Sequence, residues 1–462
     1  MAVEQTSTRP PLFPAWPRGP KPKRRTELGL LIFASVIITA LYTITELGVH
    51  SKLPSNIGTF FALVFGFSLL AHLGNRWLAP RSNAVLLPLA VLLNGIGYVV
   101  IVRWNPANGR SQAEWVALGI ILYVGTLLFV RHSRDLDRYR YLLLLIAGIL
   151  LVAPLFFPPI GGARLWIHFG SFEFQPVEIG KVLLCIFFAS YFAENKEMLS
   201  IPSSRFGNRL IIDPRPLLPI LIAWGVAMMV IGAEDDIGFA LLIFTLFIGL
   251  LWISTGRVGY LLFGVVLFAI GGVIAAHFFV QFHTRVSIWL NPWTGVNYTN
   301  LGGAQLAQGW LNMGTGGIGG TGLGLDPYAW QIPALTTDMI FAAIGTEMGL
   351  MGTSIVVIAF VLIVGAGLRI AQTARSDFSK LFATGLTLII GFQAFFIMAG
   401  VTRLLPLTGI TLPFVAYGGS SLLANYILIA LLTRISDEGM TNAAEELTGI
   451  SLPGDEPFVT VY

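Results

Sequence analysis

The stretch LTTDMIFAAIGTEMG, Leu335 to Gly349, opens a long apolar run with one carboxylate, Asp338, and carries a second, Glu347, nine residues further in. A charged side chain inside a bilayer costs about 2.5–3.5 kcal/mol even on the scales that give the lowest values. Because chains seldom keep such residues without a use, the apolar run indicates a membrane span and its acids are candidates for function.

The composition of the whole chain supports the membrane interpretation. Of its 462 residues, 55% are hydrophobic and 11% are charged, whereas about 25% of the residues of an ordinary soluble domain are charged. A helix needs about 20 apolar residues to cross the hydrocarbon layer, and lipid satisfies no free backbone polar group. We therefore expect an all-α polytopic membrane protein.

Twelve apolar runs are long enough to be spans. They lie near residues 27–47, 57–74, 84–102, 115–130, 141–157, 176–194, 217–232, 237–254, 258–279, 338–368, 381–402 and 412–433. With both ends placed inside, 21 of the 28 Lys and Arg residues fall in inside segments. This bias follows the positive-inside rule and predicts two cytoplasmic termini.

The same pattern divides the chain into a membrane domain, 27–435, and two polar cytoplasmic tails, 1–26 and 436–462, which we expect to be flexible. The first span follows a basic start and lacks a small-residue cleavage site, so it is predicted to be retained. The basic residues are scattered over short loops, which argues against a nucleic-acid partner. A lone cysteine, Cys185, excludes a disulfide framework and a cysteine metal cluster.

Two outside segments are unusually rich in aromatic residues and glycine. One, 158–178, reads PPIGGARLWIHFGSFEFQPVE, and the other is a long loop over 280–337. Four tryptophans in the second loop argue against disorder, and a loop of this length is usually functional. We expect it to contain short amphipathic or re-entrant helices at the outer membrane face.

Asp338 follows two threonines at the entry of the tenth span, which puts its carboxylate at the outer water boundary. One interpretation is a helix N-cap that accepts backbone hydrogen bonds, and a catalytic role can coexist with it. The glycine run Gly314 to Gly324 could bring backbone N–H groups close to phosphate, or it could serve as a lid or as tight packing. It lacks the context of a dinucleotide fingerprint or a P-loop.

Three adjacent acids, Glu234, Asp235 and Asp236, lie between the seventh and eighth spans. Because they repel one another, they should sit in water, bind a cation or face a basic group. A solvated turn is the simplest interpretation, and Asp236 could equally cap the eighth span.

Two further charged sites lie in or beside spans. Glu178 and Lys181 are three residues apart, a spacing that puts both side chains on one helix face and predicts a buried ion pair. Arg403 lies between apolar stretches with no local acid, so we expect it to be buried and to reach a carboxylate or an anionic ligand elsewhere. The histidines show no metal-ligand spacing.

Five motifs occur in order over residues 141–435: GGARLWIHFGSFEFQPVEIGK, EDDIGFA, FHTRVSIWLNP, IPALTTDMIFAAIGTEMG and LLPLTGITLPFVAYGGSS. Together they resemble the SEDS family of RodA, FtsW and SpoVE, and RodA more than FtsW. The family core has ten spans, so this chain has two extra helices on its N-terminal side. It departs from the family pattern at Val177, Glu234, Asp235, Asn291, Thr346 and Ala416.

The resemblance implies a peptidoglycan glycosyltransferase of the bacterial cytoplasmic membrane. Such an enzyme polymerises lipid II at the outer face, for elongation or division, with a class B penicillin-binding protein as partner and with membrane lipids around it. Asp338 matches the catalytic aspartate, which would act as general base. Glu178 and Lys181 match an intramembrane ion pair and are candidate substrate-binding residues.

The leaving group of this reaction is a lipid diphosphate, so cationic groups or a divalent cation, Mg²⁺ or Mn²⁺, should stabilise it. Candidate cationic residues are Arg164, Arg285 and Arg403. Two alternatives stay open. One is a lipid II flippase with a polar path through Glu178, Lys181, Arg403 and Glu347, and the other is a non-catalytic scaffold for a penicillin-binding protein.

Overall fold

The computed structural model describes residues 24–158, 164–169, 172–200, 204–206, 209–211, 217–234, 236–278, 280–299, 302–326 and 332–448. Most of the predicted N-terminal tail and the end of the predicted C-terminal tail therefore lie outside the described residues.

Helices make up most of the described chain. In order they are α1 (Arg24–His50), α2 (Ile57–Leu78), α3 (Leu86–Trp104), α4 (Pro106–Phe129), α5 (Asp135–Arg138), α6 (Arg140–Val152), η1 (Ala153–Phe156), α7 (Val177–Glu194), α8 (Lys196–Ser200), α9 (Leu218–Ala233), α10 (Ile237–Thr255), α11 (Gly259–Phe278), α12 (Val280–Leu290), α13 (Gly295–Thr299), α14 (Gly303–Gly316), α15 (Ile340–Thr373), α16 (Asp377–Val401) and α17 (Gly419–Thr448). Two short antiparallel hairpins join them: β1 (Ile167–Phe169) pairs with β2 (Phe172–Phe174), and β3 (Ser204–Phe206) pairs with β4 (Arg209–Ile211).

The all-α polytopic membrane fold is confirmed. Among the described residues, eight helices are long and apolar enough to cross a membrane: α1, α2, α3, α4, α10, α15, α16 and α17. The other four predicted spans coincide with α6, α7, α9 and α11. Each predicted span thus has a helix, while the number of crossings stays a prediction.

Several helix boundaries differ from the predicted ones for local reasons. α4 begins at Pro106, earlier than predicted, because the Asn105 side chain caps it by accepting a hydrogen bond from Asn108 N at 3.2 Å. α17 begins at Gly419 rather than near 412, because the preceding residues include Pro413 and run as a non-helical segment.

α17 also continues beyond the predicted boundary at 435, to Thr448. This extension is anchored to loops between other helices. Arg81 N donates to Asp437 Oδ1 at 2.7 Å, and Ser133 N donates to Glu438 Oε1 at 2.7 Å. These contacts keep the first residues of the predicted tail packed against the bundle.

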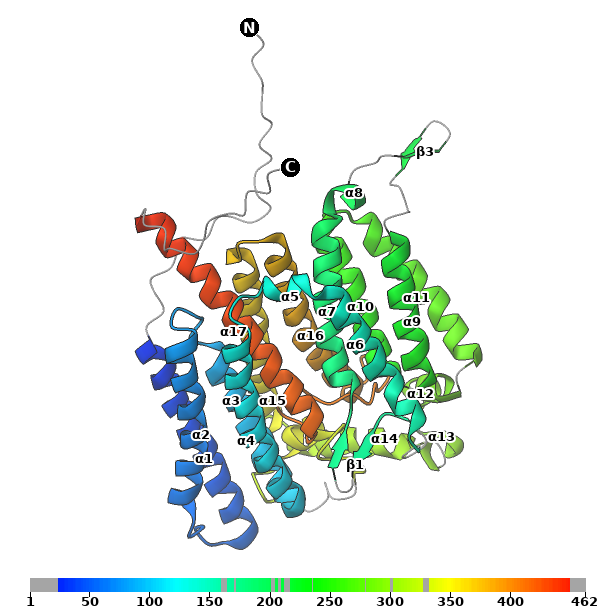
Figure 1. Ribbon diagram of the computed structural model, residues 1–462. Helices are drawn as coiled ribbons and strands as arrows, with labels where there is room; N and C mark the ends of the chain where they lie inside the picture. The colour runs from blue at the N-terminus through cyan, green and yellow to red at the C-terminus, as the bar shows by residue number, and fades with distance from the viewer. Residues whose placement is uncertain are drawn as a thin grey trace.

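The connecting segments gather at two ends of the bundle (Figure 1). β1 and α12, α13 and α14 lie at one end, which we call the loop end, and α5, α8 and β3 lie at the opposite end. The long loop over 280–337 contains the three short helices α12, α13 and α14, as predicted. Both segments predicted to be outside lie at the loop end, which fits the alternation of spans.

The centre of the bundle is formed by α7, which packs against α6, α10, α16 and α17. Most of its side chains are buried. α15, which packs against α16, is broken at Gly349, where φ is 64° and ψ is −160°. The break separates a short helical segment that follows Asp338 from the longer membrane helix, so the local geometry near Asp338 depends on how this break is held.

Candidate functional site

The segment between α16 and α17, residues 403–418, crosses the loop end and contacts several elements of the bundle. We call it the strap. Its backbone accepts hydrogen bonds from Arg285 Nη1 at Leu407 O (2.8 Å) and from Gln393 Nε2 at Thr411 O (3.0 Å). Its Tyr417 N donates to Thr336 O at 2.8 Å. The strap therefore links α12, α16 and the turn that carries Asp338.

Asp338 lies in a turn immediately before α15. The helix begins at Ile340 and its N-cap is Met339, which makes no side-chain cap, so the N-cap interpretation of Asp338 was wrong. The Asp338 side chain is partly exposed. Within the described part of the chain its carboxylate has no hydrogen-bond partner, so its oxygens are available to a ligand.

The surroundings of Asp338 make its carboxylate a stronger base than a solvated one. Removal from water raises the pKa of Asp338 to about 6, against the opposing effect of the Arg285 guanidinium. At neutral pH the carboxylate is then mostly ionised, while its pKa lies close to the working pH, which suits a general base.

Asp236 belongs to the same electrostatic neighbourhood. Burial raises its pKa to about 7, and the Phe239 N–H and Arg285 oppose that change, whereas Glu178 and Asp338 add to it. The fold thus brings Asp236, Arg285 and Asp338 together from α10, α12 and the turn before α15.

The acid cluster next to α10 is buried, so the solvated-turn interpretation was wrong for the two acids that the structure describes. Glu234 is 1% exposed and Asp236 is 6% exposed, while Asp235 lies outside the described residues. Burial and the neighbouring Asp236 raise the pKa of Glu234 to about 8. Asp236 caps α10 by accepting a hydrogen bond from Phe239 N at 3.0 Å, as the second interpretation predicted.

The predicted ion pair between Glu178 and Lys181 is present on α7. Lys181 Nζ donates to the Glu178 carboxylate and, at 2.7 Å, to Gln393 Oε1 of α16. Glu178, Lys181 and Gln393 are all 0% exposed. This burial separates the pair from the surface, and Gln393 connects it to the strap through Thr411.

Arg403 is exposed, so its predicted burial was wrong. It donates to Trp289 O at 3.2 Å and to Leu290 O at 2.9 Å, and its guanidinium lies 5.2 Å from the centre of the Trp310 ring. The last carbonyls of α12 lack helical partners and carry partial negative charge. They take the place of the predicted carboxylate.

The other two candidate arginines differ in their surroundings. The Arg285 guanidinium lowers the pKa of both Asp338 and Asp236, against the larger effect of burial. Arg164 is exposed and donates to Leu155 O at 3.3 Å. Among the described contacts, none brings Arg164 to Asp338.

The glycine run stabilises the break in α15. Thr321 N donates to Thr346 O at 2.9 Å and Gly322 N to Glu347 O at 3.1 Å, while Leu350 N donates to Gly317 O at 3.0 Å. Since backbone N–H groups of this run already bond to protein carbonyls, the structure favours the packing interpretation over a phosphate cradle.

Glu347 does not join the other charged residues of the predicted polar path. It is 1% exposed and lies 3.8 Å from Arg103 Nε of α3. Arg103 also donates to Gly324 O at 3.2 Å. Among the described contacts, none connects Glu347 with Lys181 or Arg403, so the path predicted for a flippase is not continuous in this conformation.

Two residues of this site were not predicted from the sequence. Gln393 completes the buried pair, and its position in the middle of an apolar run was a usable signal, because polar side chains in spans are costly. Ser420 accepts a hydrogen bond from Gln175 N at 2.9 Å and fixes the start of α7 against α17. No local pattern predicted that contact.

Known proteins resemble this chain in both sequence and fold. A family model described as a cell cycle protein, of the FtsW, RodA and SpoVE type, matches residues 87–440. The peptidoglycan glycosyltransferase RodA of Mycobacterium leprae is 37% identical in an alignment of 428 positions that covers 90% of this chain and 91% of that protein. A probable peptidoglycan glycosyltransferase FtsW of Geobacter sp. is 31% identical over 77% of this chain and 96% of its own length.

A solved structure shares the fold with a TM-score of 0.62 at 22% sequence identity, covering 78% of this chain and 98% of its own. It belongs to work on the structural coordination of polymerization and crosslinking by a peptidoglycan synthase complex. The family match begins at the start of α3, earlier than the sequence motifs, so α1 and α2 lie outside it. The chain therefore belongs to the FtsW, RodA and SpoVE family.

Proposed function

We propose that this chain is a peptidoglycan glycosyltransferase that polymerises lipid II into glycan strands, with Asp338 as general base. The names of its relatives support the activity. The observation that carries the assignment of the residue is the accessible Asp338 carboxylate, with its pKa of about 6, beside Arg285 at the loop end.

The position of Asp338 suits a substrate with a sugar head and a lipid tail. Glycan extension requires the 4-hydroxyl of one sugar to attack the anomeric carbon of another, which breaks the bond to a lipid diphosphate. Asp338 would take the hydroxyl proton while the lipid tail stays in the bilayer. Arg285, near this carboxylate, would stabilise the departing diphosphate, and Arg164 and Arg403 stay further candidates for that role.

The buried pair has a different role in this proposal. Glu178 and Lys181 are fully buried, so we assign them to positioning rather than to direct contact with substrate. They hold Gln393, which holds the strap at Thr411, and the strap in turn contacts the turn of Asp338.

The divalent cation stays a prediction. Among the described residues, no group of three or more His, Cys, Asp or Glu side chains is placed to hold a metal ion. No step above depends on Mg²⁺ or Mn²⁺.

A class B penicillin-binding protein is the proposed partner, because the solved structure with this fold comes from a complex that coordinates polymerization with crosslinking. The charge bias of the loops supports a bacterial cytoplasmic membrane orientation with both termini inside. In that orientation the loop end, with Asp338, faces outward, where lipid II would be polymerised.

Polymerisation by purified protein in detergent tests the proposal. Lipid II is the substrate and glycan strands separated on a gel are the product. A flippase makes no polymer in detergent, and a scaffold makes none without a catalytic partner. Asp338→Asn keeps the shape of the side chain but removes the base, so we expect a loss of about 10²–10⁴-fold in rate.

Asp377→Asn is the matched control, because Asp377 lies at the opposite end of the bundle in a half-exposed pair with Lys196. This variant should keep wild-type activity. Full activity of Asp338→Asn would refute the role of Asp338. Wild-type protein that makes no polymer with or without a penicillin-binding protein would refute the enzyme.

A further inference from the structure

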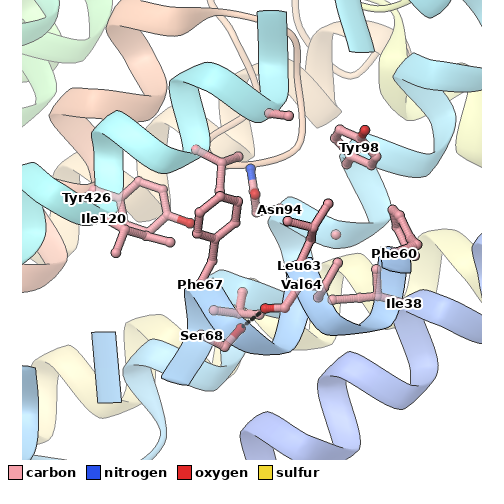
Figure 2. Close-up of a pocket in the computed structure, with 14 residues that line it drawn as sticks. Ile38, Phe60, Leu63, Val64, Phe67, Ser68, Asn94, Tyr98, Ile120 and Tyr426 are labelled. Carbon is pink, nitrogen blue, oxygen red and sulfur yellow. Dashed lines mark hydrogen bonds between the residues drawn. The ribbon is translucent and has the colours of Figure 1, made fainter. Parts of the chain in front are cut away.

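A cavity lies away from Asp338, where α1 and α2 pack against α3, α4 and α17. The cavity has a volume of about 100 Å³. Figure 2 shows the side chains that line it, with Phe60, Leu63 and Phe67 coming from α2 and Tyr98 from α3. All five helices are candidate membrane spans, so the cavity lies within the part of the protein that lipid surrounds.

The lining is mostly apolar. Aliphatic and aromatic side chains form most of it, with the hydroxyls of Tyr98 and Tyr426 among its few polar groups, and two other polar groups are already engaged: Ser68 Oγ donates to Val64 O at 2.7 Å, and Asn94 Nδ2 donates to Phe414 O at 3.0 Å. A buried water needs two to four polar partners, and apolar cavities of about 150 Å³ stay dry and bind small apolar molecules. A hydrocarbon chain is the ligand that this lining fits.

The cavity runs from the loop end toward the middle of the membrane. On α2, which begins at Ile57, the lining extends from Phe60 to Ser68, a rise of about 12 Å. This is close to half the thickness of the hydrocarbon layer, about 15 Å. Leu63, which lines the cavity, is 54% exposed on the outer surface of the bundle, so lipid can reach the cavity from the side.

Two cations lie toward the loop end of the same helices. Arg110 is exposed one turn before the lining residue Ala113 on α4, and Lys52 is exposed between α1 and α2. A phosphate headgroup at this level would meet positive charge while its chain enters the cavity.

The cavity needs helices that the family match does not include. α1 and α2 precede residue 87, whereas Asp338, Arg285 and the strap all lie within the match. A binding site for a lipid chain that depends on α1 and α2 is more consistent with a resident lipid than with the substrate of a reaction that the whole family shares. We propose that this cavity holds one acyl chain of an anionic membrane phospholipid from the leaflet at the loop end.

This lipid would contact the wall that supports the strap. Asn94 binds the Phe414 carbonyl, and the rings of Phe414 and Tyr426 pack edge to face with their centres 5.7 Å apart. Phe414 belongs to the strap and has a φ of 64°, which is strained for this residue type. The bound chain therefore fills the space behind a strained part of the strap.

Native mass spectrometry of the full chain, washed in mild detergent to remove loosely held lipid, tests the proposal. Wild-type protein should retain one phosphatidylglycerol when that lipid is supplied. Ala113→Phe places a ring in the cavity, and we expect about a tenfold loss of occupancy, equivalent to about 1.4 kcal/mol. Val116→Phe, at another lining position, should have the same effect and replaces the first variant if that one does not fold.

Leu118→Phe is the matched control, because Leu118 lies on the same helix, is exposed and does not line the cavity. It should retain the lipid. The proposal is overturned if wild-type protein retains no lipid, or if filled and control variants retain it equally. It is also overturned if the retained species is a polyprenyl phosphate rather than a phospholipid. These results are independent of whether the chain polymerises lipid II.

Discussion

Replacing Lys181 by Met should destabilise the protein more than a typical core substitution. In the structure, Lys181 Nζ donates to both Glu178 and Gln393 Oε1, and none of these three side chains is exposed. The variant leaves a buried carboxylate without its counter-charge, which costs about 3–5 kcal/mol. Against a typical stability of about 5–15 kcal/mol, this is a large fraction.

The double variant Lys181→Met, Glu178→Met separates the cost of the unpaired Glu178 carboxylate from the other losses of stability. It removes the uncompensated carboxylate and leaves only Gln393 Oε1 without its donor, a cost of about 1–3 kcal/mol. We therefore expect the double variant to be more stable than the single one, although both lack the ion pair. Thermal unfolding in detergent, followed by tryptophan fluorescence, measures the order. The reasoning is refuted if Lys181→Met matches wild type, or if the double variant is no more stable than the single one.

Two further predictions concern the site and the break in α15. Arg285→Met removes the positive charge that lowers the pKa of Asp338, so the acid limb of the pH–rate profile should move to higher pH, whereas Arg285→Lys should leave it in place. An unchanged limb in Arg285→Met would contradict this electrostatic role. Gly349→Ala should cost about 1–3 kcal/mol, because φ is 64° and a Cβ there would lie 2.3 Å from Gly320 N. Gly365→Ala on the same helix, where a Cβ meets nothing within 4 Å, should be neutral or stabilise by up to about 1 kcal/mol; equal melting temperatures for the two variants would exclude strain at Gly349.

The membrane helices were predictable because the length of an apolar run and its charges are local properties of sequence. For the same reason, the predicted start of α17 was wrong. Residues 412–418 are as apolar as a span, but they belong to the strap, where Pro413 and contacts with other elements prevent a helix. Apolar composition does not distinguish a membrane helix from a buried non-helical segment.

The site was predictable only in part. The pair of Glu178 and Lys181 follows from their spacing on one helix, and Asp338 was identified by its motif. Arg403 bonds to Leu290, more than a hundred residues earlier in the chain, and that partner left no trace near Arg403 in the sequence. Gln393 likewise meets Lys181 across two helices, so contacts of this kind had to come from the fold.

The pH dependence of polymerisation by the wild-type protein tests the central claim most directly. If Asp338 works as a general base with a pKa of about 6, only its ionised form is active. The rate at low substrate concentration should then be nearly constant from about pH 7 to about pH 8 and should fall about tenfold per unit below about pH 6. A rate that stays constant down to about pH 5 would contradict the account.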